Sequence, residues 1–159
     1  MMFENCHTPD DVVCVYRALG FTVTCVGGRV ALIATPRLGG VAVPSYLAHG
    51  VRSGLDVDAT PTTTLVIGRS RSGPETEQIF LVGPAAGRRF TSHVLDQLDD
   101  AGVRILDVGQ RIWLPMTDSS IGWKWLGTQP SLGIRLPSAT SVLTAAHDLL
   151  LATRRGTLP

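Results

Sequence analysis

The chain has 159 residues, of which 44% are hydrophobic and 17% are charged, with 17 Gly and 10 Pro. This composition excludes an intrinsically disordered chain, and the length predicts a single domain over residues 1–159. Fourteen Lys and Arg residues oppose thirteen Asp and Glu residues, so the formal charge of +1 excludes the strong positive field of a non-specific nucleic-acid binder.

The three cysteines indicate a cellular compartment. Cys6, Cys14 and Cys25 are odd in number, and no charged segment followed by an apolar stretch precedes them. This pattern is typical of a reducing environment, so we expect a cytoplasmic protein. We expect no membrane partner either, because Gly, Pro or Arg interrupts every apolar run before it reaches the roughly 18 residues of a membrane span.

The first predicted elements are a helix and a β-hairpin. Thr8 is a suitable N-cap, and apolar residues recur at helical spacing over residues 9–19. Two β-branched runs follow at 21–26 and 29–34. The intervening Gly27-Gly28 pair accepts the positive φ angles of a two-residue hairpin turn.

The middle of the chain predicts three strands and one short helix. Residues 39–43 form an apolar strand that Pro44 ends, and a short helix over 44–51 follows. Two further apolar runs, 63–68 and 78–83, predict strands on either side of a polar loop.

The last third predicts two helices and three strands. An apolar stripe predicts an amphipathic helix over 88–101, and a second hairpin joins strands 103–108 and 111–115. A strand over 122–126 and a helix over 139–153 complete the chain. Together these elements predict a single α+β domain, with a mainly antiparallel sheet of hairpins covered by about three helices.

Several short motifs resemble a known family. They are Gly40-Val41-Ala42-Val43-Pro44, Ile79 to Pro84, Gly109 to Pro115, and Gly122 to Leu126. Within roughly residues 29–136, their order resembles the N-terminal domain of actinobacterial bifunctional DNA primase/polymerase proteins.

The resemblance implies a catalytic centre that this chain lacks. Active members of that superfamily hold divalent metals with clustered carboxylates for phosphoryl transfer. The matching strand here, Gly40 to Val43, carries no acid. The nucleotide-binding histidine of the family lies on a strand, whereas His93 and His147 fall in predicted helices. The resemblance therefore implies a shortened, non-catalytic relative.

One acidic pair keeps a metal-dependent alternative open. Asp56 and Asp58 have the spacing that places two carboxylates on one face of an extended segment, which is half of a Mg²⁺ site. A metal-dependent nucleotidyltransferase would use this pair. The alternative is a solvated turn, and no other cofactor is expected.

Two groups of residues are candidates for phosphate or nucleic-acid contact. Arg88 and Arg89 follow a glycine-containing turn between a predicted strand and a predicted helix, where free amides bind anions. Arg111 and Lys124, with Trp123 and Trp125 on one face of a strand, suit single-stranded nucleic acid, since bases stack on rings and cations follow phosphates. The alternatives are an ordinary turn for the first group and a core or protein interface for the tryptophans.

Two hypotheses about function follow. The first is a non-catalytic module of the primase–polymerase type that binds nucleic acid or nucleotide, in replication or in a mobile element. The second is a protein-interaction subunit of a homo- or hetero-oligomer, anchored by Trp113, Trp123 and Trp125.

Overall fold

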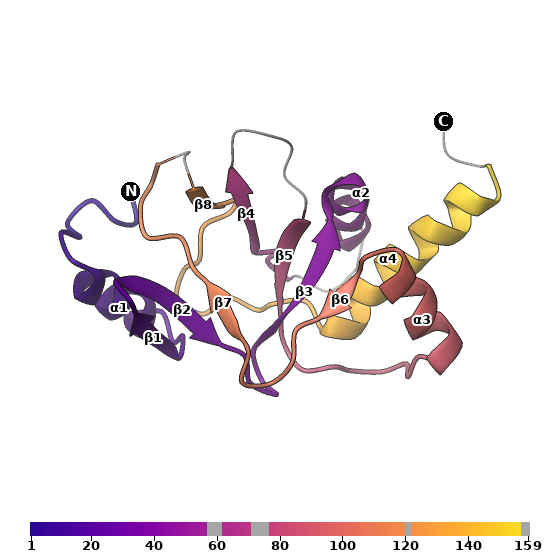
Figure 1. The fold of residues 1–159 in the computed structure, drawn as a ribbon, viewed down its shortest axis with the longest axis horizontal. Coiled ribbons are helices and arrows are strands. Elements are labelled where there is room, and N and C mark those ends of the chain that lie inside the picture. Colours follow the sequence, from indigo (N-terminus) through magenta and orange to yellow (C-terminus); the bar gives the residue numbers. More distant parts are fainter. Residues whose placement is uncertain (57–61, 71–76, 120–121, 157–159) are drawn as a thin grey trace.

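The computed structural model describes residues 1–56, 62–70, 77–119 and 122–156 (Figure 1). Its helices are α1 (Pro9–Ala18), α2 (Ser45–Asp56), α3 (Ser92–Asp100) and α4 (Ala139–Arg154). Its strands are β1 (Val23–Val26), β2 (Arg29–Ile33), β3 (Gly39–Pro44), β4 (Val66–Ser70), β5 (Glu77–Val82), β6 (Arg104–Ile105), β7 (Arg111–Trp113) and β8 (Gly122–Trp125). The predicted α+β class is confirmed. Within the described residues, no helix combines the length and apolar character needed to cross a membrane.

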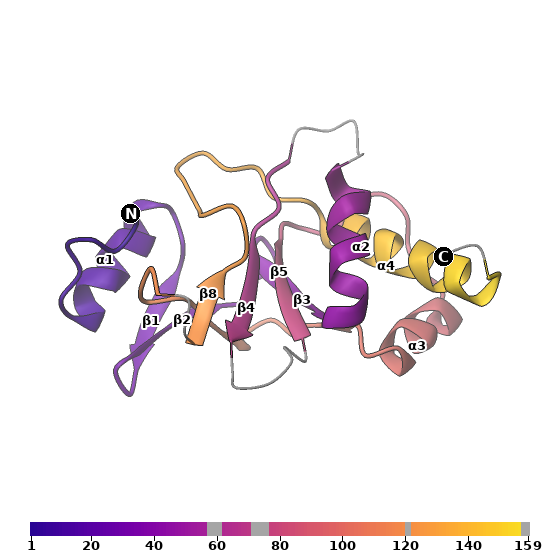
Figure 2. The same cartoon turned by 90° about the horizontal axis from the view of Figure 1, so that it is seen from above.

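The strands form two antiparallel sheets. The small sheet has the order β1-β2-β7, and the large sheet has the order β6-β3-β5-β4-β8. Figure 2 shows α1 and the β1–β2 hairpin at one end of the molecule and α2, α3 and α4 at the other end, with the large sheet between them. The sequence analysis expected one sheet and about three helices, and the division into two sheets was not foreseen.

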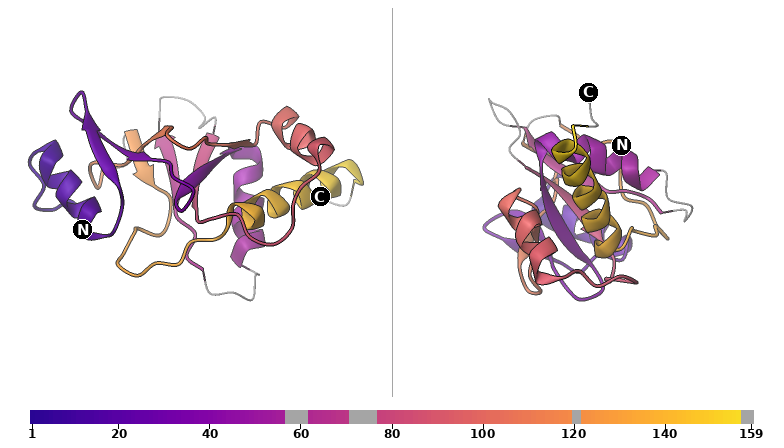
Figure 3. Two further views of the ribbon diagram at one scale, coloured as in Figure 1. Left: turned by 90° about the horizontal axis from the view of Figure 1, so that it is seen from below. Right: turned by 90° about the vertical axis from the view of Figure 1, so that its right-hand side faces the viewer.

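The large sheet is built on a recognisable topology. The chain runs β3-α2-β4-β5-α3-β6, and these strands lie in the order β6-β3-β5-β4 with antiparallel neighbours. This is the split βαβ, or ferredoxin-like, arrangement. Strand β8 extends it beside β4, and α4 lies between α2 and α3 when the helical end faces the viewer (Figure 3, right).

Both faces of the large sheet are buried. One face, which includes Val43, Val66 and Phe80, packs against α2, α3 and α4. The other face, which includes Ala42 and Ile67, packs in a second cluster with side chains of the small sheet and α1. We refer to these as the helix side and the inter-sheet side of the large sheet.

The N-terminal elements agree with the sequence prediction. The Thr8 hydroxyl accepts from the Asp11 amide at 3.2 Å and caps α1. Val26 pairs directly with Arg29, so the hairpin turn is Gly27-Gly28, whose φ angles are +57° and +72°. These are the positive values that favour glycine at both turn positions.

The predicted hairpin over residues 103–115 is wrong. Ile105 pairs with Val41 in the large sheet, whereas Trp113 pairs with Ala31 in the small sheet. The residues between β6 and β7 therefore carry the chain from one sheet to the other. The predicted turn that contains Gly109 is present, since the Gln110 amide donates to the Asp107 carbonyl at 3.0 Å. The strands on either side of it, β6 and β7, pair with strands of different sheets and not with each other.

Three other boundaries also differ. The helix predicted over 44–51 continues to Asp56, because Val51 and Leu55 extend its buried stripe into the helix-side cluster. Strand β4 begins at Val66 and ends at Ser70, so it lies later in the chain than the predicted 63–68, although Leu65 is buried. Helix α3 begins at Ser92 and not at Arg88, because Thr91 is its N-cap.

Candidate functional site

Trp123 and Trp125 lie on β8, at one edge of the large sheet. Both are half-buried, and both pack against the inter-sheet cluster, so their predicted common face is confirmed. The indole N–H of Trp125 donates to the hydroxyl of Tyr16 at 3.2 Å. The Arg69 guanidinium carbon lies 5.5 Å from the Trp123 ring centre. Trp125 therefore acts in packing, and the exposed cation of this strand pair is Arg69.

Lys124 alternates with these tryptophans along β8. It pairs with Gly68, and strand alternation directs its side chain toward the helix side of the sheet. Lys124 and Trp125 nevertheless line one small hollow of about 210 Å³ together with Asp118, whereas Trp123 is not among its lining residues. The structure therefore brings Lys124 to Trp125 but does not join all three residues as one binding surface.

Arg111 belongs to a different sheet. Arg111 is an exposed residue of β7 and pairs with Ile33 of β2. It lies on the same face of the sheet as Trp113, two residues further along β7. The Arg29 guanidinium carbon, from β2, lies 4.3 Å from the Trp113 ring centre. Register places Thr24, Val26, Arg29, Ala31, Ile33, Arg111 and Trp113 on this face, which we call the outer face of the small sheet. None of these side chains belongs to either hydrophobic cluster of the described residues.

Arg29 was missed by the sequence analysis. Its partner Trp113 lies 84 positions away along the chain, and only the pairing of β2 with β7 brings them together. The sequence carries no local signal for that pairing.

Arg88 and Arg89 lie in the segment between β5 and α3, and both are exposed. The expectation that a helix starts at Arg88 is wrong, because the Thr91 hydroxyl accepts from the Val94 amide at 3.4 Å and caps α3 there. The Ala86 amide donates to the Thr140 hydroxyl at 3.2 Å. The phosphate hypothesis therefore loses the adjoining helix N-terminus on which it depended.

The predicted groups are spread over the molecule. In Figure 1, β8 lies near the upper edge, and the segment from β5 to α3 runs along the lower edge. Arg111 lies on the small sheet, apart from both. Arg88 and Arg89 are therefore not part of a common surface with the tryptophans.

Asp56 is the last residue of α2 and is exposed. The extended conformation expected at Asp56 is wrong, since Asp56 is helical. Asp58 lies outside the described residues. Among the described residues, no three His, Cys, Asp or Glu side chains are grouped as metal ligands.

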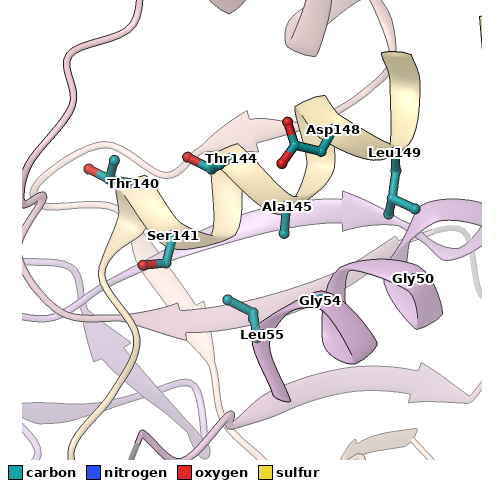
Figure 4. A pocket seen from close by; sticks show the side chains of 9 residues that line it. All are labelled: Gly50, Gly54, Leu55, Thr140, Ser141, Thr144, Ala145, Asp148 and Leu149. Carbon is teal, nitrogen blue, oxygen red and sulfur yellow. The ribbon is translucent and has the colours of Figure 1, made fainter. Parts of the chain in front are cut away.

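Two hollows border α2. A groove of about 420 Å³ lies between α2 and α4, where Gly50 and Gly54 face Ala145 and Leu149. Figure 4 shows Ala145 and Leu149 directed toward α2, whereas Asp148 points away. This groove follows the contact between α2 and α4, where the two glycines allow the helices to approach closely. The second hollow, of about 440 Å³, is polar, and Arg52, Asp56 and three consecutive threonines line it.

Comparison of the chain with protein-family models, with curated proteins and with solved structures returns no match. The resemblance to primase–polymerase domains remains a prediction from short motifs.

Proposed function

We propose that the chain is a non-catalytic module that binds single-stranded nucleic acid on the outer face of the small sheet. The observation that carries this proposal is the stacking of Arg29 on Trp113 at 4.3 Å, with the exposed Arg111 two residues from the ring. An aromatic ring beside two arginines is the combination that single-stranded nucleic acid requires, because bases stack and phosphates pair with cations.

The topology of the large sheet supports this choice of surface. RNA-recognition motifs bind bases on the open face of a four-stranded sheet. Here the inter-sheet side of the large sheet is filled by Ala42, Ile79 and Leu81, which pack against the small sheet. A strand of nucleic acid has no access to that face. The outer face of the small sheet is the sheet surface that remains outside both cores of the described residues.

The charge of the chain limits the strength of binding. A net charge of +1 provides little long-range attraction, so affinity depends on local contacts. Each phosphate contact contributes about 0.7 to the salt slope for a single strand. Contacts from Arg29 and Arg111 to two phosphates therefore predict a slope of about −1.4 in the logarithm of the association constant against the logarithm of salt concentration.

The test is a titration of fluorescently labelled single-stranded DNA and RNA at low and at physiological salt, with intrinsic tryptophan fluorescence as a second signal. We expect binding with tryptophan quenching. Trp113→Ala removes about 1–3 kcal/mol per stacked base, and Trp113→Phe retains most of the affinity. Arg111→Ala lowers both the affinity and the salt slope.

The matched control is Arg155→Ala, an exposed arginine at the C-cap of α4. It removes the same charge from another element and should leave the affinity within twofold. Absence of binding at low salt would overturn the proposal, as would equal losses in Arg111→Ala and Arg155→Ala.

A second candidate function is a self-associating subunit, and a separate apolar surface favours it. Leu95, Ile105 and Val108 are 39%, 52% and 68% exposed, and Leu95 and Ile105 border a groove of about 350 Å³ between α3 and β6. Burial of exposed apolar side chains such as Leu95 and Ile105 favours association. Light scattering that gives the mass of a dimer, reduced to that of a monomer by Ile105→Glu, would support it. A monomer at every concentration tested would exclude it.

A further inference from the structure

The polar hollow beside α2 contains an arginine whose charge is poorly satisfied. Arg52 is half-buried, and its Nη2 donates to Gln78 Oε1 at a long 3.5 Å. Its Nε is fully buried and has no hydrogen-bond partner in the structure. Among the described residues, no carboxylate lies within 4.0 Å of its guanidinium. A half-buried guanidinium with one long hydrogen bond and no carboxylate beside it favours the binding of an anion at its accessible donors.

The lining of the hollow suits an anion. Thr62, Thr63, Thr64 and Thr128 line it together with Gly127 and Leu126. The threonine segment is held in place, since the Thr63 amide donates to the Arg135 carbonyl at 2.7 Å. A guanidinium with several hydroxyl donors around a hollow of about 440 Å³ leaves room for an anion attached to a larger molecule.

The hollow lies on the helix side of the large sheet. Arg52 of α2 donates to Gln78, which pairs with Gly68 of β4. Leu126, whose side chain lies against Gly68, also lines the hollow.

Asp56 offers an alternative explanation for the arginine in this hollow, namely that it neutralises Arg52 within the chain. It lines the same hollow and lies four residues after Arg52 on α2, a spacing at which two side chains on a helix form an ion pair. The two groups are not within 4.0 Å of each other, and Asp56 is exposed at the rim. A carboxylate at this place is suited to accept a hydrogen bond from a hydroxyl of a bound molecule.

From these contacts we propose that the hollow binds the phosphate group of a small molecule, with Arg52 holding the phosphate and Asp56 accepting from a hydroxyl of the same molecule. This site is separate from the outer face of the small sheet and does not depend on nucleic-acid binding there.

The test uses the full chain with three probes: inorganic phosphate, ribose 5-phosphate and, as a control without phosphate, ribose. Binding is measured by calorimetry and by the rise of the melting temperature with ligand concentration. We expect ribose 5-phosphate to bind more tightly than phosphate, and ribose not to bind. Absence of binding of either phosphate compound at millimolar concentration would overturn the proposal.

Variants separate the roles of the two charged residues. Arg52→Gln should weaken both phosphate compounds by roughly tenfold to a hundredfold, the effect of losing charge-assisted hydrogen bonds. Arg52→Lys, which keeps the charge but not the planar donor fork, should give an intermediate affinity. The matched control Arg89→Gln removes an exposed arginine and should change nothing.

Asp56→Asn distinguishes a binding site from an internal ion pair. If the proposal holds, this variant binds inorganic phosphate more tightly, because a repelling charge is gone, and loses the preference for ribose 5-phosphate. If Asp56 instead serves only to neutralise Arg52, the variant melts at a lower temperature and binds neither compound differently from the unmodified chain. Nucleic-acid binding should be unchanged in Arg52→Gln, so failure of one proposal does not imply failure of the other.

Discussion

Trp125 donates its indole N–H to the hydroxyl of Tyr16 at 3.2 Å, which ties the edge strand β8 of the large sheet to helix α1. The same hydroxyl donates to the Pro115 carbonyl at 2.6 Å. Tyr16 is fully buried, and Phe3 and Phe21 pack edge-on against its ring. One phenol therefore links α1, β8 and the segment that follows β7, at the place where the two sheets meet.

Tyr16→Phe should lower the free energy of unfolding by about 1–3 kcal/mol, because it leaves a buried carbonyl and an indole N–H without their partner. Urea unfolding followed by tryptophan fluorescence measures this loss. Tyr46→Phe is the matched control: its hydroxyl also donates to a carbonyl, that of Ala101 at 2.9 Å, but the residue is 70% exposed. An equal effect of the two substitutions would contradict the role given to Tyr16.

Alkaline pH should destabilise the fold through the same residue. Burial raises the pKa of Tyr16 far above its ordinary value of about 10. The unfolded chain loses this proton above about pH 10 while the folded chain retains it, so stability is present below that pH and falls as pH rises. The contribution of one proton is up to about 1.4 kcal/mol per pH unit. Denaturant midpoints measured from pH 8 upward should fall less steeply in Tyr16→Phe.

Acid should act on the start of α1. The Asp11 carboxylate accepts from the amides of His7 at 2.9 Å and Thr8 at 2.8 Å, and these bonds lower its pKa. For a carboxyl group with a lowered pKa, stabilisation is present above the unfolded value of about 3.9 and is lost as pH falls through the folded value. The protection of the His7 and Thr8 amides from exchange, taken relative to the intrinsic rate at each pH, should therefore fall in acid, and Asp11→Asn should remove most of that pH dependence. Asp10→Asn, in the same helical turn, should retain it.

Local signals were sufficient for some elements and not for others. The Thr8 cap and the Gly27-Gly28 turn each act within a few residues, and each was predicted from sequence. The split of residues 103–115 between two sheets depends on partners near Val41 and Ala31, which no neighbouring residue specifies.

The candidate sites follow the same division. Trp123 and Trp125 were placed on one face from strand alternation alone. The stacking of Arg29 on Trp113 and the enclosure of Arg52 require contacts between distant segments, so the sequence could not indicate them. Conversely, Arg88 and Arg89 do not lie at the predicted helix N-terminus, because the Thr91 side chain caps α3 three residues further along the chain.

Gly40→Ala should test how tightly the two sheets pack. A Cβ atom at Gly40 would lie 3.0 Å from the methyl carbons Cδ1 of Ile112 and Leu106 and 3.1 Å from Cγ2 of Ile79. All three side chains are buried, so they have little room to move, and overpacking of this kind costs about 1–3 kcal/mol. The measurement is again urea unfolding.

The neighbouring strand residue provides the control for that substitution. A Cβ at Gly39 would meet only the Thr35 carbonyl oxygen, at 3.8 Å, which is an ordinary contact. Gly39→Ala should be neutral or stabilise by up to about 1 kcal/mol, because alanine restricts the unfolded chain. If Gly40→Ala were as stable as Gly39→Ala, the side chains of Ile112, Leu106 and Ile79 would have to yield by a few tenths of an ångström without cost. The packing between the two sheets at β3 would then be looser than the contacts at Gly40 indicate.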